Sequence, residues 1–125
     1  MIYRKYNNNP KGKKTSDCVI RAISHALSKD WCDVADELFL ISKKLYTTQT
    51  STQTYTKYLE NYQTIPVKYV DENTGKNKRF KVKDITWSGT FIIVIANHLT
   101  MVKDGILYDT WDCREKSCYK IWRIK

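Results

Sequence analysis

The sequence predicts an α+β fold, with helices in the first half of the chain and an antiparallel β-sheet in the second. Two observations support this prediction. Apolar residues recur at helical spacing between residues 18 and 62, and from residue 65 onward they alternate with polar residues or form short continuous runs, as strands do. A chain of 125 residues is long enough for a core of its own, so we expect one domain over residues 1–125.

The first half of the chain predicts an arm and then helices. Residues 1–16, rich in Asn and Lys, indicate a mostly irregular arm. A helix is expected over about residues 18–28, with Asp17 as its N-cap. Asp30 is expected to cap a second helix. The buried stripe of this second helix would comprise Trp31, Val34, Ala35, Leu38, Phe39 and Leu45.

A loop, a third helix and several strands are expected after that. The polar stretch 47–54 predicts a loop, and a short helix is then indicated by Tyr55, Tyr58, Leu59 and Tyr62. The continuous apolar run 90–96 is typical of a central strand. Asp104-Gly105 is a strong two-residue hairpin signal. The other expected strands cover residues 65–70, 79–83, 98–103, 106–111 and 119–124.

Composition narrows the classes of function. The net charge of +9 suits an acidic partner, a nucleic acid or solubility alone. No apolar run reaches the roughly 18 residues of a membrane span, and residues 1–14 lack the apolar core of a signal peptide. We therefore expect a cytoplasmic protein without a membrane partner. Reduced thiols are expected at Cys18, Cys32, Cys113 and Cys118.

Cys18 is the candidate nucleophile because it occupies the first position of the first expected helix. The free backbone N–H groups and the helix dipole favour an anion there, and a thiolate is an anion. The alternative is a small apolar residue in a first turn. His25 lies two turns further along, about 10 Å away, so it cannot contact the thiol.

His98 is the candidate base because it begins a strand beside an expected acid. With the turn at Asp104-Gly105, His98 faces Trp111 across the hairpin, and Asp109 lies on the same face one diagonal step away. A carboxylate there can orient the imidazole. Asp112 falls on the other face unless a bulge intervenes, so it remains the alternative.

This order of thiol, histidine and acid resembles the papain-like cysteine peptidases. The resemblance implies a papain-like fold with Cys18, His98 and Asp109 as catalytic triad. Residues 109–111, Asp-Thr-Trp, resemble the family's Asn-Ser-Trp motif, which implies that Trp111 shields the His–Asp hydrogen bond. The segments DCVIRAIS, HLTMVKDG and YDTWDC also resemble small phage and prophage proteins of Gram-positive bacteria. That resemblance implies an accessory role in the cytoplasm of a bacterial host.

The chain departs from the papain pattern before the nucleophile. The family's Gln, which binds the oxyanion, is absent ahead of Cys18. Asn9 is our choice for that donor, with the backbone N–H of Cys18 as the second donor. Asn9, Asp17 and Trp111 are thus the expected supporting residues.

The function expected is a thiol hydrolase, either a cysteine peptidase or isopeptidase or an amidase, acting on a host or phage protein or peptide without cofactor or metal. Transfer to an amine, as in transglutaminases, or deamidation uses the same residues. The main alternative is a non-catalytic phage protein that binds a host defence factor or a nucleic acid through a basic, Tyr-rich surface. A zinc site would draw on His98, Cys113 and Cys118.

Overall fold

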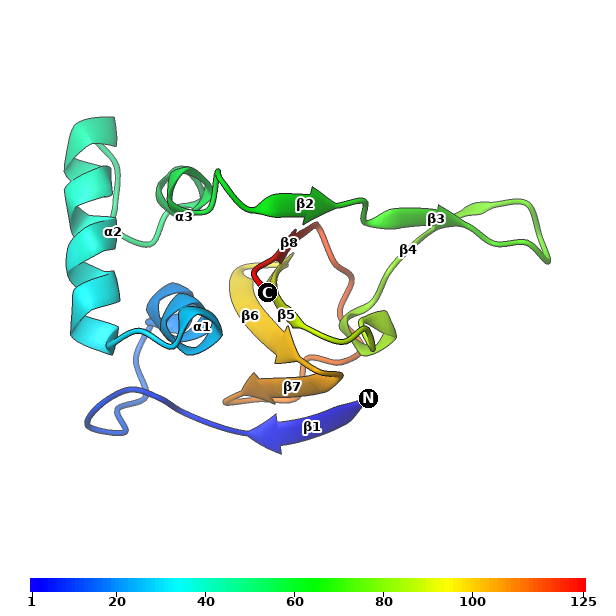
Figure 1. Cartoon of the computed structure of the whole chain (residues 1–125), viewed down its shortest axis with the longest axis horizontal. Coiled ribbons are helices and arrows are strands. Elements are labelled where there is room, and N and C mark those ends of the chain that lie inside the picture. Colours follow the sequence, from blue (N-terminus) through cyan, green and yellow to red (C-terminus); the bar gives the residue numbers. More distant parts are fainter.

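The computed structural model describes all 125 residues and has the expected α+β architecture. Three helices, α1 (Cys18–Leu27), α2 (Trp31–Leu45) and α3 (Thr52–Tyr58), lie on one face of a six-stranded sheet (Figure 1). The sheet has the order β1-β7-β6-β5-β8-β2. Its strands are β1 (Ile2–Lys5), β2 (Gln63–Ile65), β5 (Thr90–Ile95), β6 (His98–Lys103), β7 (Ile106–Asp109) and β8 (Lys120–Arg123).

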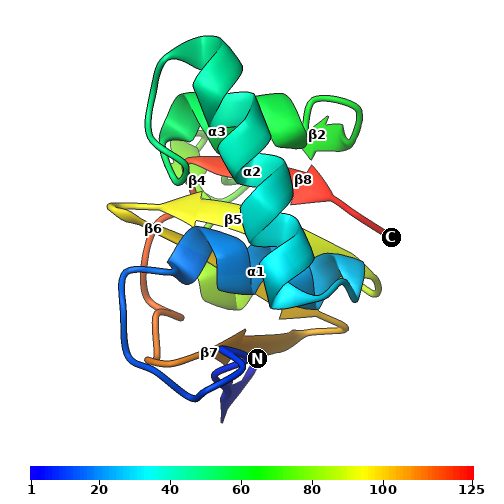
Figure 2. The ribbon, with the colours of Figure 1, turned by 90° about the vertical axis from the view of Figure 1, so that its left-hand side faces the viewer.

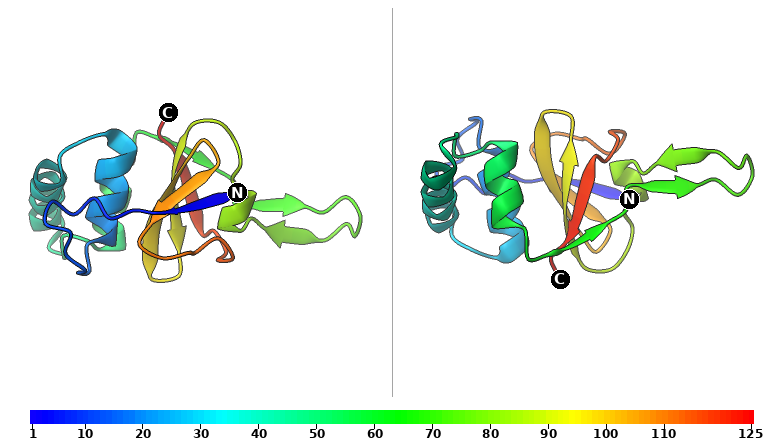
Figure 3. Two further views of the ribbon diagram at one scale, coloured as in Figure 1. Left: turned by 90° about the horizontal axis from the view of Figure 1, so that it is seen from below. Right: turned by 90° about the horizontal axis from the view of Figure 1, so that it is seen from above.

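A separate two-stranded hairpin, β3 (Lys68–Val70) and β4 (Asn77–Arg79), projects away from the sheet on the side opposite the helices (Figure 3). A short 3₁₀ turn, η1 (Val82–Asp84), follows it. We expected one strand over 65–70, but Pro66 has no N–H to donate and divides it into β2 and β3. The prediction of a strand over 79–83 is also wrong, because β4 ends at Arg79.

The sheet is mixed, and the expectation of a purely antiparallel sheet is therefore wrong. β1 runs parallel to β7, with Ile2 beside Ile106 and Lys5 beside Asp109. Residues 2–5 belong to the arm that we expected to be irregular. A strand of four residues is too short to show a clear alternation of polar and apolar residues. Its partner strand lies more than 100 residues away along the chain, and local periodicity cannot predict a pairing over that distance.

The helices begin and end close to their predicted limits. Ser28 ends α1 in the left-handed region, at φ 53°. Asp30 caps α2 through the backbone N–H groups of Cys32 and Asp33, as expected. Asp17 occupies the N-cap position of α1, but its side chain makes no capping hydrogen bond, so that part of the prediction is wrong.

Two smaller expectations about the helical half are also wrong. Phe39 and Leu45 do not join the buried stripe of α2; Phe39 is 53% exposed. Helix α2 packs mainly against α1 and α3, so only a narrow side of it is buried. Helix α3 begins at Thr52, inside the stretch expected to be a loop, because Ser51 accepts a capping hydrogen bond from Thr54 N.

Helix α1 lies between α2 and the sheet, which buries it on most sides (Figure 2). One core forms between the helices and the sheet, and a second covers the opposite face of the sheet. In β5, Ile92 joins the first core while Phe91 and Ile93 join the second. This burial on both faces explains the continuous apolar run, and β5 is a central strand as predicted.

The hairpin of β6 and β7 has the predicted turn. Lys103 pairs with Ile106, and Asp104 and Gly105 both have positive φ, at 49° and 75°, as a type I′ turn requires. This register determines which side chains of the two strands share a face with the helices. None of the helices has the length and apolarity needed to cross a membrane.

Burial on α2 predicts a sharp contrast between two leucines. Leu38 is fully buried and Leu40 is 58% exposed on the same helix. Leu38→Ala should lower the free energy of unfolding by roughly 2–5 kcal/mol, because it leaves a cavity. Leu40→Ala should change it by less than about 0.5 kcal/mol. Urea unfolding followed by circular dichroism measures both, and equal losses would contradict this packing.

Candidate active site

The candidate site lies where the N-terminus of α1 meets the start of β6 and the end of β7. Cys18 is the first residue of α1, His98 the first of β6 and Asp109 the last of β7. The fold therefore brings the three residues of the expected triad together. Helix and strand termini position all three, so each side chain is attached to rigid backbone.

Asp109 is the acid that contacts His98. Its Oδ2 lies 2.6 Å from His98 Nε2 and accepts a hydrogen bond of 2.6 Å from Thr100 Oγ1, while Oδ1 accepts one of 2.6 Å from Thr110 N. Burial alone would raise the pKa of this carboxyl, but these bonds and the charge of His98 lower it below its ordinary value. Asp112, the alternative acid, is exposed and forms an ion pair with Arg114.

Cys18 and His98 line the same cleft, and their pKa values move in opposite directions. Burial opposes charge on the thiol, but hydrogen bonds from the His98 side chain and the Leu99 backbone, with the charges of His98 and Arg21, lower the pKa of Cys18. Burial also opposes charge on His98, but its bonds to Asp109 and Cys18 raise its pKa to about 9. These directions favour a thiolate–imidazolium pair at neutral pH.

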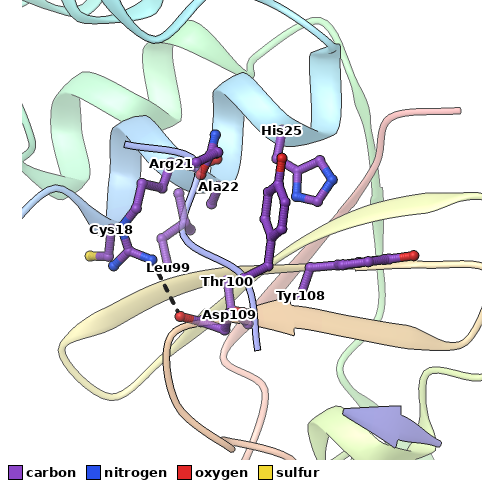
Figure 4. A pocket seen from close by; sticks show the side chains of 10 residues that line it. Cys18, Arg21, Ala22, His25, Leu99, Thr100, Tyr108 and Asp109 are labelled. Atoms are coloured by element: carbon purple, nitrogen blue, oxygen red, sulfur yellow. Dashed lines mark hydrogen bonds and ion pairs between the residues drawn. The ribbon is translucent and has the colours of Figure 1, made fainter. Parts of the chain in front are cut away.

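Arg21, a residue that we did not single out from the sequence, links the helix to this pair. It is buried, and its Nε lies 2.8 Å from Asp17 Oδ1 while Nη1 lies 3.5 Å from Asp109 Oδ1. Figure 4 shows its guanidinium between Cys18 and Asp109. The spacing of Asp17 and Arg21, four residues apart on a helix, was a readable signal for the first contact. The second contact depends on the tertiary fold.

Two of the expected supporting residues, Asp17 and Asn9, contact each other. Asp17 Oδ2 accepts hydrogen bonds from Asn9 Nδ2 at 3.0 Å and from Trp31 Nε1 at 3.1 Å. Burial would raise the pKa of Asp17, but these bonds and Arg21 lower it. Asn9 thus holds the start of α1 through Asp17. Its use as an oxyanion donor stays a prediction.

Trp111 lies beside His98, although it is not paired with His98 across the hairpin as expected. β7 ends at Asp109, so Trp111 lies outside the ladder instead of opposite His98. Its ring nevertheless packs at 5.3 Å from the imidazole, with a tilt of 60°. Trp111 covers one side of His98 while remaining 40% exposed.

His25 lies at the far end of the site and does not belong to the triad. Its ring packs 4.5 Å from Tyr6 and 4.9 Å from Tyr108. Burial, and then the charge of Lys103, lower its pKa, so His25 is neutral at pH 7. In the close-up of Figure 4 it lies to the right of Ala22, on the side away from Cys18.

An open cleft of about 360 Å³ reaches both Cys18 and His98. The loop before α3 and the turn between β5 and β6 form its walls, with Thr50, Tyr55, Val94 and Asn97 among the lining residues. Its lining combines apolar side chains with hydroxyl groups. This volume lies at the lower end of the range for small-molecule clefts and suits a short peptide segment or a single side chain.

The donors that could hold a metal differ from the expected zinc set. His98, Asp109 and Cys113 each place a ligand atom within 4.8 Å of the others, whereas Cys118 is not in this group. Burial raises the pKa of Cys113 to about 12, which keeps it a thiol. A metal here would replace the His98–Asp109 hydrogen bond and would need that thiol to lose its proton.

Comparison of the chain with protein-family models, with curated proteins and with solved structures finds no match. The site is therefore defined by its geometry and by the chemistry of its side chains.

Two aspartates near the site provide a matched test of the electrostatics. Asp109→Asn should lower the pKa of His98 by roughly 1–3, because the charge and the acceptor that stabilise its imidazolium are lost. Asp112→Asn, which removes an exposed carboxylate paired with Arg114, should leave that pKa unchanged. NMR titration of the ¹⁵N-labelled imidazoles reports this, with His25 as internal reference. Equal effects of the two variants would contradict the assignment of Asp109.

Two arginines allow a similar comparison of stability. Arg21→Met leaves Asp17 and Asp109 buried without their shared cation and should cost roughly 3–5 kcal/mol at pH 7. Arg114→Met removes an exposed pair and should cost less than about 1 kcal/mol. The pKa values of Asp17 and Asp109 are both lower in the folded than in the unfolded protein. Their contribution to the free energy of unfolding is therefore fully present above the pKa of the unfolded state, and it is lost as the pH falls through the pKa of the folded state. The Arg21 effect in urea unfolding should therefore shrink below about pH 4.

Proposed function

We propose that this protein is a thiol hydrolase of the papain-like type, with Cys18 as nucleophile, His98 as general acid and base, and Asp109 as the residue that orients His98. One observation carries the proposal: a thiol at a helix N-terminus lines the same cleft as an imidazole that is hydrogen-bonded to a buried carboxylate. The pKa directions of Cys18 and His98 agree with it.

In the first half-reaction the Cys18 thiolate forms an S–C bond to the carbonyl carbon of an amide, and the carbonyl oxygen takes up the electron pair. Because Asp109 holds Nε2, the other ring nitrogen of His98, Nδ1, is the one available to the thiol and the substrate. His98 then gives its proton to the leaving nitrogen, the C–N bond breaks and a thioester remains on Cys18.

In the second half-reaction His98 takes a proton from water, whose oxygen attacks the thioester carbon. The S–C bond then breaks and releases the acid and the Cys18 thiolate, while His98 is again the imidazolium. Asp109 stabilises that charged form in both steps and fixes which ring nitrogen faces the substrate. Trp111 limits the access of water to one side of His98.

The oxyanion needs donors at the start of α1. As the first residue of the helix, Cys18 has a backbone N–H without an intrahelical acceptor. That group is the first donor in this proposal, and Asn9, held beside Asp17, is the second. An oxyanion donor typically contributes about 3 kcal/mol to lowering the barrier.

The papain-like assignment, the likeness to phage and prophage proteins and a place in a bacterial cytoplasm are part of the same proposal. They are supported by the order of Cys18, His98 and Asp109 along an α+β chain and by the motifs around them. The substrate in this proposal is a protein or peptide, because the open cleft beside the thiol suits a short extended segment.

Alkylation by iodoacetamide, read by peptide mass, tests the nucleophile. At pH 6.5 Cys18 should react at least about tenfold faster than in His98→Ala, since each unit of pKa changes the thiolate fraction tenfold. His25→Ala is the matched control, because it removes the other histidine of the chain and should leave the rate unchanged. Exposed Cys32 in the same molecule provides the internal comparison.

A Cys18 that is equally slow in the parent and in His98→Ala would overturn the hydrolase assignment. Cys18 would then be a structural residue of the first turn, and a non-catalytic binding function would be the better hypothesis for this protein.

The pH dependence should separate alkylation from acyl transfer. The His98 pKa is raised, so its proton is present below about pH 9 and is lost as the pH rises through that value. The thiolate persists above it. Cleavage of a generic amide probe should therefore decline above about pH 9 while alkylation of Cys18 continues, and stopped-flow and discontinuous assays measure the two. A parallel decline would contradict the assignment of His98 as the proton donor.

A further inference from the structure

A second cleft, of about 670 Å³, lies beside the candidate site and has no part in the chemistry proposed above. None of its nine lining residues is hydrophobic. Asp17 and Arg21, both buried, are among its lining residues, as is Thr110, which follows Asp109. Cys18 directly follows Asp17 along the chain, and Thr110 directly follows Asp109, so the cleft adjoins the candidate site.

The cleft carries positive charge that no carboxylate balances. Lys5, Lys13 and Lys14 line it, and none of the three takes part in an ion pair. Asp17 is the one acid in the lining, and Arg21 already neutralises it. The N-terminus of α1 adds the positive end of its dipole. An anion in the cleft would meet three free ammonium groups.

The loop between β1 and α1 (Figure 1) carries Lys13 and Lys14. Asparagine side chains hold this loop in place. Asn7 Nδ2 donates to Lys13 O at 3.1 Å, and Asn9 Oδ1 accepts from Lys11 N at 3.0 Å and from Lys13 N at 3.3 Å. Asn9 also donates to Asp17, which ties the loop to α1. The Asn-rich arm thus fixes the position of Lys13 before any ligand arrives, which lowers the entropy cost of binding.

We infer that this cleft binds an acidic segment of the substrate, namely a peptide stretch with several Asp or Glu residues next to the amide that Cys18 attacks. The inference rests on the proposed function, because the cleft serves as a substrate subsite only if the neighbouring thiol reacts. Peptide carboxylates fit better than a nucleic acid. The basic track is short, and its one arginine is committed to carboxylates, whereas phosphate recognition favours free arginines.

The test compares two fluorescein-labelled peptides that differ only in three consecutive glutamates or three glutamines. Their binding to the full chain carrying Cys18→Ala, which prevents turnover, is measured by fluorescence anisotropy. The glutamate peptide should bind roughly tenfold more tightly at low salt, and the preference should fall as salt is raised. The double variant K13Q/K14Q should lose the preference.

The matched control is K43Q/K44Q, which removes the same charge from the last turn of α2. It should keep the preference for glutamate. Equal affinity for the two peptides, or a preference that survives K13Q/K14Q, would overturn the inference. So would an oligothymidine that binds more tightly than the glutamate peptide through the same lysines, because the cleft would then be a nucleic-acid site.

The same measurements separate this inference from the proposed function. Iodoacetamide is uncharged and needs only the thiolate, so alkylation of Cys18 does not report on the lysines. A fast thiol without glutamate preference overturns the acidic-substrate inference and leaves the nucleophile in place. An ordinary thiol with lysine-dependent glutamate binding overturns the hydrolase but supports a site for acidic peptides.

Discussion

The buried carboxylate of Asp109 is the constraint on which the rest of the site depends. An ionised group in a core is costly unless donors surround it. Here the donors come from three parts of the chain: His98 and Thr100 on β6, the backbone of Thr110, and Arg21 on α1. Satisfying this one carboxylate therefore sets the position of the helix relative to the sheet, and that position brings Cys18 to His98.

The charges around Asp109 alternate in sign. Each group contacts the next, and acids alternate with bases. The order is Asp17, Arg21, Asp109, His98 and the Cys18 thiolate. The chain closes on itself, since its two ends are neighbours in sequence. Arg21, Asp109 and His98 each have an opposite charge on both sides, which favours their charged forms despite burial. No buried side-chain polar atom in the protein lacks a hydrogen-bond partner, which agrees with this arrangement.

Local signals made part of this arrangement predictable. The Asp104-Gly105 turn fixed the hairpin register, which placed Asp109 on the face of His98, and periodicity placed Cys18 at a helix start. Contacts that depend on distant segments left no local trace. The parallel pairing of β1 and the second partner of Arg21 belong to this group. Trp111 illustrates the limit of extrapolating a ladder, because β7 ends two residues before it.

The order of elements has a consequence for the newly made chain. Cys18 and Arg21 leave the ribosome long before β6 and β7, and Arg21 is separated from Asp109 by 88 residues. Until the last strands are made, the thiol has neither its imidazole nor the carboxylate that charges it. The group of Cys18, His98 and Asp109 therefore assembles only once β6 and β7 have been made, when β1 can also pair with β7. The order of elements thus ties the assembly of this group to the folding of β6 and β7.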